Sequence, residues 1–407
     1  MTGMDVLLEA GAALPDELTG DLFNHLDGAR ADLELPGPLR LSTGIAALPD
    51  DAIRVTTNGD QFLLGAATGW DVVASAMHVR RHAWVDQAPA GSTDEGRRCF
   101  LSAARELVRR GVAVSRLSAA RMDVHGDDPS AAAEEAIAGT TARMSVRYRP
   151  GDRDVEEWLD SDRLGLLPQV LWAALGLVVP DVVAEPEPEL TAGTVQVVIN
   201  DVRLPAVGPP GGDLGWPILL SARQHAGSLL TRQIVSFQLD RLAELYPELV
   251  VATRKRWSDG HITVVLRELL DEGVRIGDLR AILEACLEGA QHSGDSSDLA
   301  AAARPRIGLA LVRPYVTGGG TLRVTRLRCG WDRAKGRLSD GSVAVLHQKL
   351  AEVRAGEGSV LLTDSGMGPV VRDAVRIRFP GITLITEDEL PPGVRVDSED
   401  ELLLQQP

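Results

Sequence analysis

Few residues in this sequence are arranged as catalysis or metal binding requires. His78 and His82 stand four residues apart, which would place two imidazoles on one helix face as metal ligands. Arg80 and Arg81 lie between them, and no third ligand is close in sequence. We therefore interpret the pair as part of a solvated basic face and expect no metal. The alternative, an enzyme or ligand-binding module in the N-terminal segment, would first be sought at Trp70–Trp84.

Glycine-rich stretches offer little more. No Lys-Ser/Thr follows Gly318–Gly320, so a hairpin turn is favoured over a phosphate loop. Gly366 and Gly368 lie between a strand and a helix, where amides could hold an anion, but ordinary capping is favoured. There is no G-x-S-x-G elbow, and acidic pairs such as Glu156-Glu157 lie in polar surroundings that would not raise a carboxyl pKa. We expect no catalysis and no cofactor.

Composition limits the classes of protein that remain. The chain has 407 residues, 44% of them hydrophobic, which provides ample material for buried cores in several domains. The formal net charge of −16 disfavours a protein that wraps nucleic acid, because such proteins need a positive surface. Cys99, Cys286 and Cys329 stand far apart, so neither a disulfide scaffold nor a zinc site is expected.

The sequence leads us to expect neither a signal peptide nor a transmembrane helix. The first fourteen residues carry two acids and no base, unlike the basic start of a signal peptide. The longest apolar stretch, Leu164–Val179, contains Pro168 and Gln169 and falls short of the roughly 20 residues that span a bilayer. A cytoplasmic location is expected.

Helix and strand signals alternate in the first 155 residues, which we expect to form an α+β domain. Its predicted helices begin at Pro15, at Ser92 and after Asp127–Ser130, and the second ends at Gly111. Asn58-Gly59 predicts a tight hairpin, and alternation at residues 142–148 predicts a strand.

The sequence predicts three further structural units after residue 155. Residues 156–216 hold a short helix over Glu156–Leu167, an extended surface run at Glu185–Glu189 and a strand at Val195–Ile199. Residues 217–300 are helical. Residues 301–407 begin with strands at Ile307–Val312 and Leu322–Leu327 and continue as alternating helices and strands, a pattern typical of a parallel α/β layer.

Two amphipathic helices in the helical unit are the most informative feature. Helices over Ile262–Glu272 and from Asp278 to Leu287 are separated at Gly273, and their apolar faces are expected to pack together. The packing residues are Val265, Leu266, Leu269 and Leu270 against Leu279, Ile282, Leu283 and Cys286. A DNA-reading corner is a weaker alternative, because the second helix offers only Arg280 and carries Glu284 and Glu288.

These residues resemble the FHIPEP family of flagellar and type III secretion export-gate proteins, in their cytoplasmic C-terminal region, over residues of about 160–407. Leu175–Val182 resembles the family's entry strand, and Val195–Val202 the strand after it. Val360–Thr363 and Leu384–Leu390 resemble its terminal α/β domain. The residues that match the family signature and the helix before it are Leu229, Arg232, Gln233, Leu266, Leu269, Leu270, Gly273, Val274, Ile276, Asp278, Leu279, Arg280, Ile282, Leu283 and Glu284.

The resemblance implies an α+β multidomain fold: the N-terminal α+β domain, a reduced ferredoxin-like segment, a helical middle domain and a C-terminal α/β domain. It also implies a non-enzymatic homo-oligomer with protein partners in secretion, possible peripheral association with a membrane complex, and no nucleic acid. Family members normally begin with a membrane domain, and here about 155 residues of α+β sequence stand in its place, so no channel is expected. Only loop-like sequence, Leu204–Arg223, replaces a family subdomain that helps dock chaperones.

Three tryptophans are candidate contact residues. Trp216, Trp257 and Trp331 are each flanked by polar or glycine residues and could be partly exposed anchors. The favoured alternative is that they are partly buried packing residues.

Overall fold

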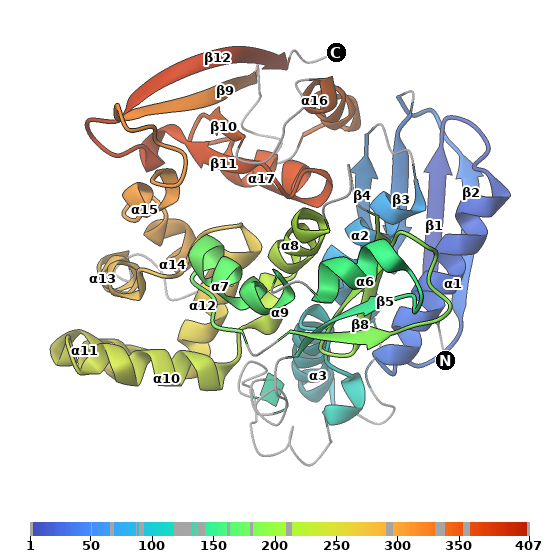
Figure 1. Ribbon diagram of the computed structural model, residues 1–407, viewed down its shortest axis with the longest axis horizontal. Helices are drawn as coiled ribbons and strands as arrows, with labels where there is room; N and C mark the ends of the chain where they lie inside the picture. Colours follow the sequence, from blue (N-terminus) through green and yellow to red (C-terminus); the bar gives the residue numbers. More distant parts are fainter. Residues whose placement is uncertain are drawn as a thin grey trace.

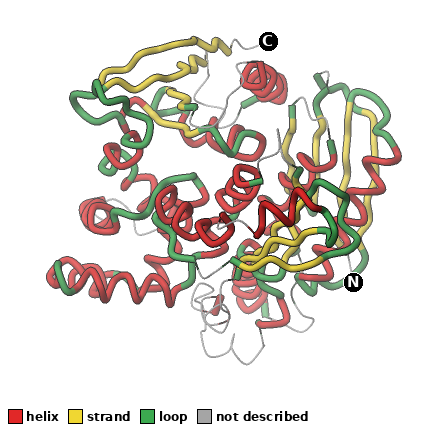
Figure 2. The backbone as a smooth tube through the Cα atoms, viewed as in Figure 1, coloured by secondary structure: helices red, strands yellow, loops and turns green. Residues whose placement is uncertain are grey.

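In the residues that it describes, the computed structural model has three sheets, with helices between and around them (Figure 2). It describes residues 3–49, 51–65, 69–86, 88, 93–117, 132–133, 136, 143–160, 163–179, 182–208, 214–289, 296–329, 338–352 and 359–404.

The first sheet has the strand order β2-β1-β3-β4. β1 and β2 are parallel because α1 connects them, whereas β3 and β4 form the predicted hairpin. Asn58 and Gly59 turn that hairpin with φ of 45° and 93°, the left-handed values that the Asn-Gly pair favours. The elements are β1 (Met4–Ala10), α1 (Asp16–Asp32), β2 (Leu39–Ile45), β3 (Ile53–Thr57) and β4 (Asp60–Leu64).

Helices cover this sheet and complete the first core. They are α2 (Trp70–Val79), η1 (Arg81–Trp84), α3 (Asp94–Arg109) and the short η2 (Val114–Arg116). Thr93 caps α3 by accepting a hydrogen bond from the amide of Gly96, and Gly111, with φ of 71°, follows its end. The predicted cap Ser92 and the helix start at Asp127–Ser130 lie outside the described residues.

The second sheet has the order β6-β5-β7-β8, with β5 parallel to β6 and antiparallel to β7. Its elements are β5 (Met144–Tyr148), α6 (Arg153–Asp160), α7 (Arg163–Leu175), β6 (Val183–Pro186), β7 (Val195–Ile199) and β8 (Val202–Val207). The single helix predicted over Glu156–Leu167 is wrong, since two helices share that stretch. β6 is an edge strand, as its proline requires. The expected boundary at residue 155 falls within this layer, after β5.

A helical region follows and shares one continuous core with the second sheet. Its helices are α8 (Gly215–Gln224), α9 (Ala226–Leu229), α10 (Arg232–Ala243), α11 (Pro247–Arg256), α12 (Asp259–Asp271), α13 (Leu279–Gly289) and α14 (Ser296–Ala303). α14 packs against both α12 and α13, a contact absent from the two-helix prediction. α10 and α11 project together from the body of the molecule (Figure 1).

The third sheet is wholly parallel, in the order β11-β10-β9-β12, which confirms the predicted parallel layer. Its elements are α15 (Gly308–Val312), β9 (Thr321–Cys329), α16 (Asp340–Glu352), β10 (Val360–Thr363), α17 (Gly368–Arg378), β11 (Thr383–Thr386), η5 (Glu387–Glu389) and β12 (Arg395–Leu404).

One predicted strand in this region is wrong. Ile307–Val312 forms a helical turn, α15, in which Ile307 and Leu311 are buried one turn apart while Leu309 is 64% exposed. Gly308 lies so close to the backbone of η5 that a Cβ at this position would be 2.1 Å from the carbonyl oxygen of Glu389. The apolar sequence fits either period, and tertiary packing selects the helix.

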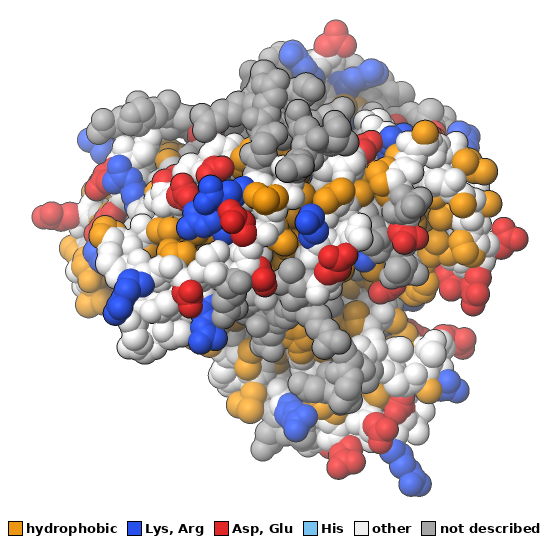
Figure 3. Space-filling model, turned by 90° about the horizontal axis from the view of Figure 1, so that it is seen from above, with side chains coloured by type: hydrophobic (Ala, Val, Ile, Leu, Met, Phe, Trp, Pro, Cys, Tyr) orange, Lys and Arg blue, Asp and Glu red, His pale blue; other side chains and the backbone are white. Residues whose placement is uncertain are grey.

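The first sheet and its helices contact both the second sheet and the parallel layer. α1 and α2 pack on β8, α2 also packs on α17, and β4 lies against α16. Of the described helices, none combines the length and apolar character needed to cross a membrane. On the face shown in Figure 3, acidic and basic side chains lie beside one another rather than in areas of one sign.

Candidate functional site

The corner between α12 and α13 is built by local signals. Gly273 adopts φ of 74°, and the amides of Gly273 and Val274 donate to the carbonyls of Leu270 and Leu269 at 2.9 and 2.8 Å, which ends α12. The Asp278 carboxylate accepts from the Ala281 amide at 3.1 Å and caps α13. The predicted pair of helices with a break at Gly273 is confirmed.

Glu272, next to this corner, joins the helical region to the parallel layer. Its carboxylate oxygens lie 3.1 Å from Arg304 and 3.3 Å from Arg372. Arg304 also holds Glu389, which is 3% exposed, at 2.6 Å. Glu389 in turn accepts from the Thr386 amide at 3.1 Å as part of a capping box. Four charged side chains, from the ends of α12 and α14, from α17 and from η5, therefore form one ionic cluster, in which only Glu272 is partly exposed.

A second buried pair joins the N-terminal unit to α12. Arg110, 1% exposed, lies 2.9 Å from Glu106 and 3.1 Å from Asp271. Burial opposes ionisation of Glu106, but the guanidinium groups of Arg110, Arg109 and Arg267 outweigh it and lower the pKa of Glu106. Gly227 permits this pair, since a Cβ there would lie 2.4 Å from both Arg110 and Asp271.

Buried histidines lie beside this pair. The Nε2 atoms of His25 and His78 are 2.8 Å apart, and the His225 ring is 6.4 Å from the His78 ring. Burial lowers the pKa of His25 to about 4 and, with His25, Arg81 and His225 nearby, that of His78 well below 6.5. These imidazoles are therefore neutral at pH 7.

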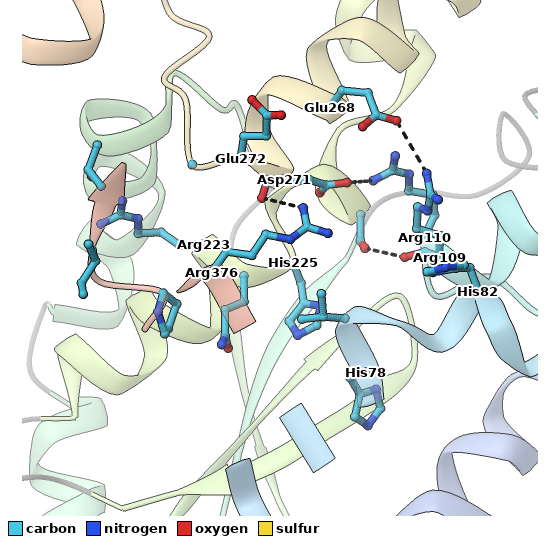
Figure 4. Close-up of a pocket in the computed structure, with 17 residues that line it drawn as sticks. His78, His82, Arg109, Arg110, Arg223, His225, Glu268, Asp271, Glu272 and Arg376 are labelled. Carbon is cyan, nitrogen blue, oxygen red and sulfur yellow. Dashed lines mark hydrogen bonds and ion pairs between the residues drawn. The ribbon is translucent and has the colours of Figure 1, made fainter. Parts of the chain in front are cut away.

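A cavity of about 170 Å³ opens where α2, α3, α12 and α17 meet. Figure 4 shows Arg223 and Arg376 on one side of it and Arg109 and Arg110 on the other, with Asp271 between them. Within the described part of the chain, no group of three or more His, Cys, Asp or Glu side chains could hold a metal ion.

The solvated basic face expected around His78 and His82 is wrong. His78 and Arg81 are each 1% exposed, and burial lowers the pKa of His82 to about 4. α2 ends at Val79, so the two histidines lie on different elements. Arg81 instead donates to the carbonyls of Val108 and Arg109. His25 on α1 and His225, between α8 and α9, lie against His78 and so cover this end of α2.

The signature residues fall into three groups. Arg232 and Gln233 are exposed in the first turn of α10, and Arg280 pairs with Glu284 at 2.9 Å on the surface of α13. Gly273 and Asp278 form the corner described above. The rest pack in the core or against it: Leu229, Leu266, Leu269, Leu270, Val274, Ile276, Leu279, Ile282 and Leu283.

The tryptophan expectations have different outcomes. Trp257 is only 8% exposed and stacks on His261, so it is not an exposed anchor. Trp216 is half-buried, and Trp331 lies outside the described residues. Three exposed apolar side chains lie instead on the α10–α11 pair: Phe237 on α10, Val251 on α11 and Leu245 in the turn between them.

Sequence analysis missed the ionic clusters because their members are far apart in the chain. A weak signal was present in Arg304, a lone cation that follows the alanine run of α14. A charged residue at the end of an otherwise apolar helix face requires a partner when it is buried. The sequence does not indicate which acid supplies it.

Comparison with known proteins finds a matching family model, a related sequence and similar solved structures. The FHIPEP family model matches residues 218–395. The chain is 28% identical over 184 residues to the flagellar biosynthesis protein FlhA of Escherichia coli (strain K12), which covers 41% of this chain and 26% of that protein. It therefore spans about a quarter of the length of that relative.

Solved structures share the fold. The MxiA protein of Shigella flexneri has a TM-score of 0.54 at 18% identity, covering 64% of this chain and 98% of MxiA. Nonameric SctV-C of EPEC has a TM-score of 0.50 at 13% identity, covering 66% and 98%. The family resemblance inferred from the sequence is thus confirmed, and the chain contains an FHIPEP-family region at residues 218–395.

Proposed function

We propose that this chain is a non-enzymatic, cytoplasmic interaction scaffold for type III or flagellar protein export that assembles with copies of itself. The observation that carries the proposal is the FHIPEP match at residues 218–395 on an export-gate fold. One structure with that fold is nonameric. The proposal retains three expectations from the sequence. The chain is divided into four units, it associates peripherally with a membrane complex, and it has no nucleic-acid partner.

The exposed apolar side chains of α10 and α11 support self-association. Phe237 on α10 is 64% exposed, Val251 on α11 66%, and Leu245 in the turn between them 76%. The two helices project from the body (Figure 1). Exposed apolar residues gathered on one element are typical of protein interfaces. Light scattering and native mass spectrometry of the purified chain test the proposal. A strict monomer at high concentration would contradict it.

The alternative function is ligand binding by a module in the N-terminal segment. The cavity supports it, because His78 and His82 line that cavity together with residues of the family region. Alanine substitution of both histidines with no change in ligand binding would remove this alternative.

A further inference from the structure

Among the described residues that line the cavity, the cation Arg223 has no acid partner. Arg110 is paired with Glu106 and Asp271, and Arg109 lies 3.6 Å from Glu268. Arg223, on α8, makes no ion pair or hydrogen bond with any residue in the described part of the chain. Its Nε atom is buried without a partner. A half-buried guanidinium in this state is costly unless a ligand or water satisfies it.

The acids in the same wall are already engaged. Glu272 is held between Arg304 and Arg372, and Asp271 by Arg110. Burial, together with the charge of Asp271, raises the pKa of Glu268, so this carboxyl loses its negative charge more readily than usual. Free positive charge therefore remains on the Arg223 side of the cavity.

Arg376 adds a second guanidinium on that side, as Figure 4 shows. It donates to the Asp271 carbonyl at 3.3 Å, while its Nε atom has no hydrogen-bond partner and lies 3.7 Å from Asp373. The histidines in the wall contribute no charge at pH 7, because burial lowers the pKa values of His78 and His225. The site thus has two incompletely satisfied guanidinium groups.

We propose that this cavity binds a small oxyanion, a molecule bearing a phosphate or carboxylate group, through Arg223 and Arg376. Guanidinium groups match both oxyanions with paired N–H donors. The cavity of about 170 Å³ has room for roughly six waters at about 30 Å³ each, and so for an anion of several heavy atoms. Because Arg223 is on α8 and Arg376 on α17, the bound anion links the helical region to the parallel layer. The proposal is independent of self-association.

Isothermal titration calorimetry of the full chain tests it, with inorganic phosphate and succinate as separate probes and sodium chloride at matched ionic strength. We expect saturable binding of one probe, which also identifies the oxyanion type. Arg223→Ala should weaken that binding at least tenfold. Arg241→Ala is the matched control, because this α10 arginine is 68% exposed, lies 3.8 Å from Glu244 and does not line the cavity. No saturable binding of either probe, or equal binding by Arg223→Ala, would overturn the proposal.

If Arg223→Ala fails to fold, hydrogen exchange of the unmodified chain provides a second test of the proposal. The bound probe should slow amide exchange in α8 and α17, the helices that carry the two arginines. Slowed exchange confined to other elements would place the anion elsewhere and overturn the proposal. Arg223→Lys should retain part of the affinity, since it keeps the charge but loses the paired donors.

Discussion

The guanidinium of Arg304 lies 2.6 and 3.0 Å from the two carboxylate oxygens of Glu389, although 85 residues separate them in the chain. Both side chains are almost fully buried, at 2% and 3% exposure. This buried pair holds η5, and with it the parallel layer, against the end of α14. Without Glu389, the buried Arg304 and Arg372 would share one acid, the partly exposed Glu272, so the cluster would carry an excess buried positive charge.

Glu389→Gln should therefore destabilise the protein by about 3–5 kcal/mol, the usual effect of removing one partner from a buried pair. Urea unfolding followed by circular dichroism measures this loss. Glu401→Gln is the control, since Glu401 is in an exposed pair with Arg328 and should change stability by less than about 1 kcal/mol. Equal unfolding midpoints for the two variants would contradict the prediction.

Acidification should destabilise the junction that contains His25 and His78. The folded pKa of His25 is about 4, against a usual value of 6.5, so the unfolded chain takes up a proton at higher pH than the folded chain. The free energy of unfolding therefore falls as the pH is lowered from about 6.5 to 4. At pH 5 the loss from His25 alone is about 2 kcal/mol relative to pH 7.5.

Urea unfolding midpoints at pH 7.5 and pH 5.0 measure this dependence, and His25→Phe isolates the contribution of one imidazole. The variant should lose less stability on acidification than the unmodified chain, by about 2 kcal/mol. The comparison uses the difference between the two pH values, so any effect of the new side chain on packing cancels. An unchanged difference would show that His25 does not titrate as its burial requires.

Local signals predicted the corner at Gly273 and the hairpin at Asn58, because each depends on backbone angles that few residues adopt. The parallel layer was also predictable, since its helices and strands alternate in sequence. Ile307–Val312 was not, because its apolar pattern fits both a strand and a helix. The burial of His78 was missed since α1 and His225, which cover it, are far away in the chain.

Gly227→Ala should strain the contact between the N-terminal unit and α12. The new methyl group would lie 2.4 Å from the side-chain ends of both Arg110 and Asp271, so at least one of these side chains must shift and their ion pair is disturbed. A loss of about 1–3 kcal/mol is expected in urea unfolding, the usual effect of overpacking a buried position. Gly20→Ala in α1 is the matched control, because nothing lies within 4 Å of its Cβ position. That change should be neutral or stabilise by up to about 1 kcal/mol, since alanine favours helix over glycine.

Substitution of the exposed apolar residues on α10 and α11 should change assembly and leave folding intact. Leu245→Asp combined with Val251→Asp replaces two side chains that are mostly exposed, so the free energy of unfolding should change by less than about 0.5 kcal/mol per substitution. If copies of the chain meet at these helices, the mass measured by light scattering should fall towards that of one chain. Leu309→Asp is the control, because this residue is 64% exposed but lies on α15. An unchanged oligomer in the double variant would exclude α10 and α11 as the contact, and a monomeric Leu309→Asp would place it at α15.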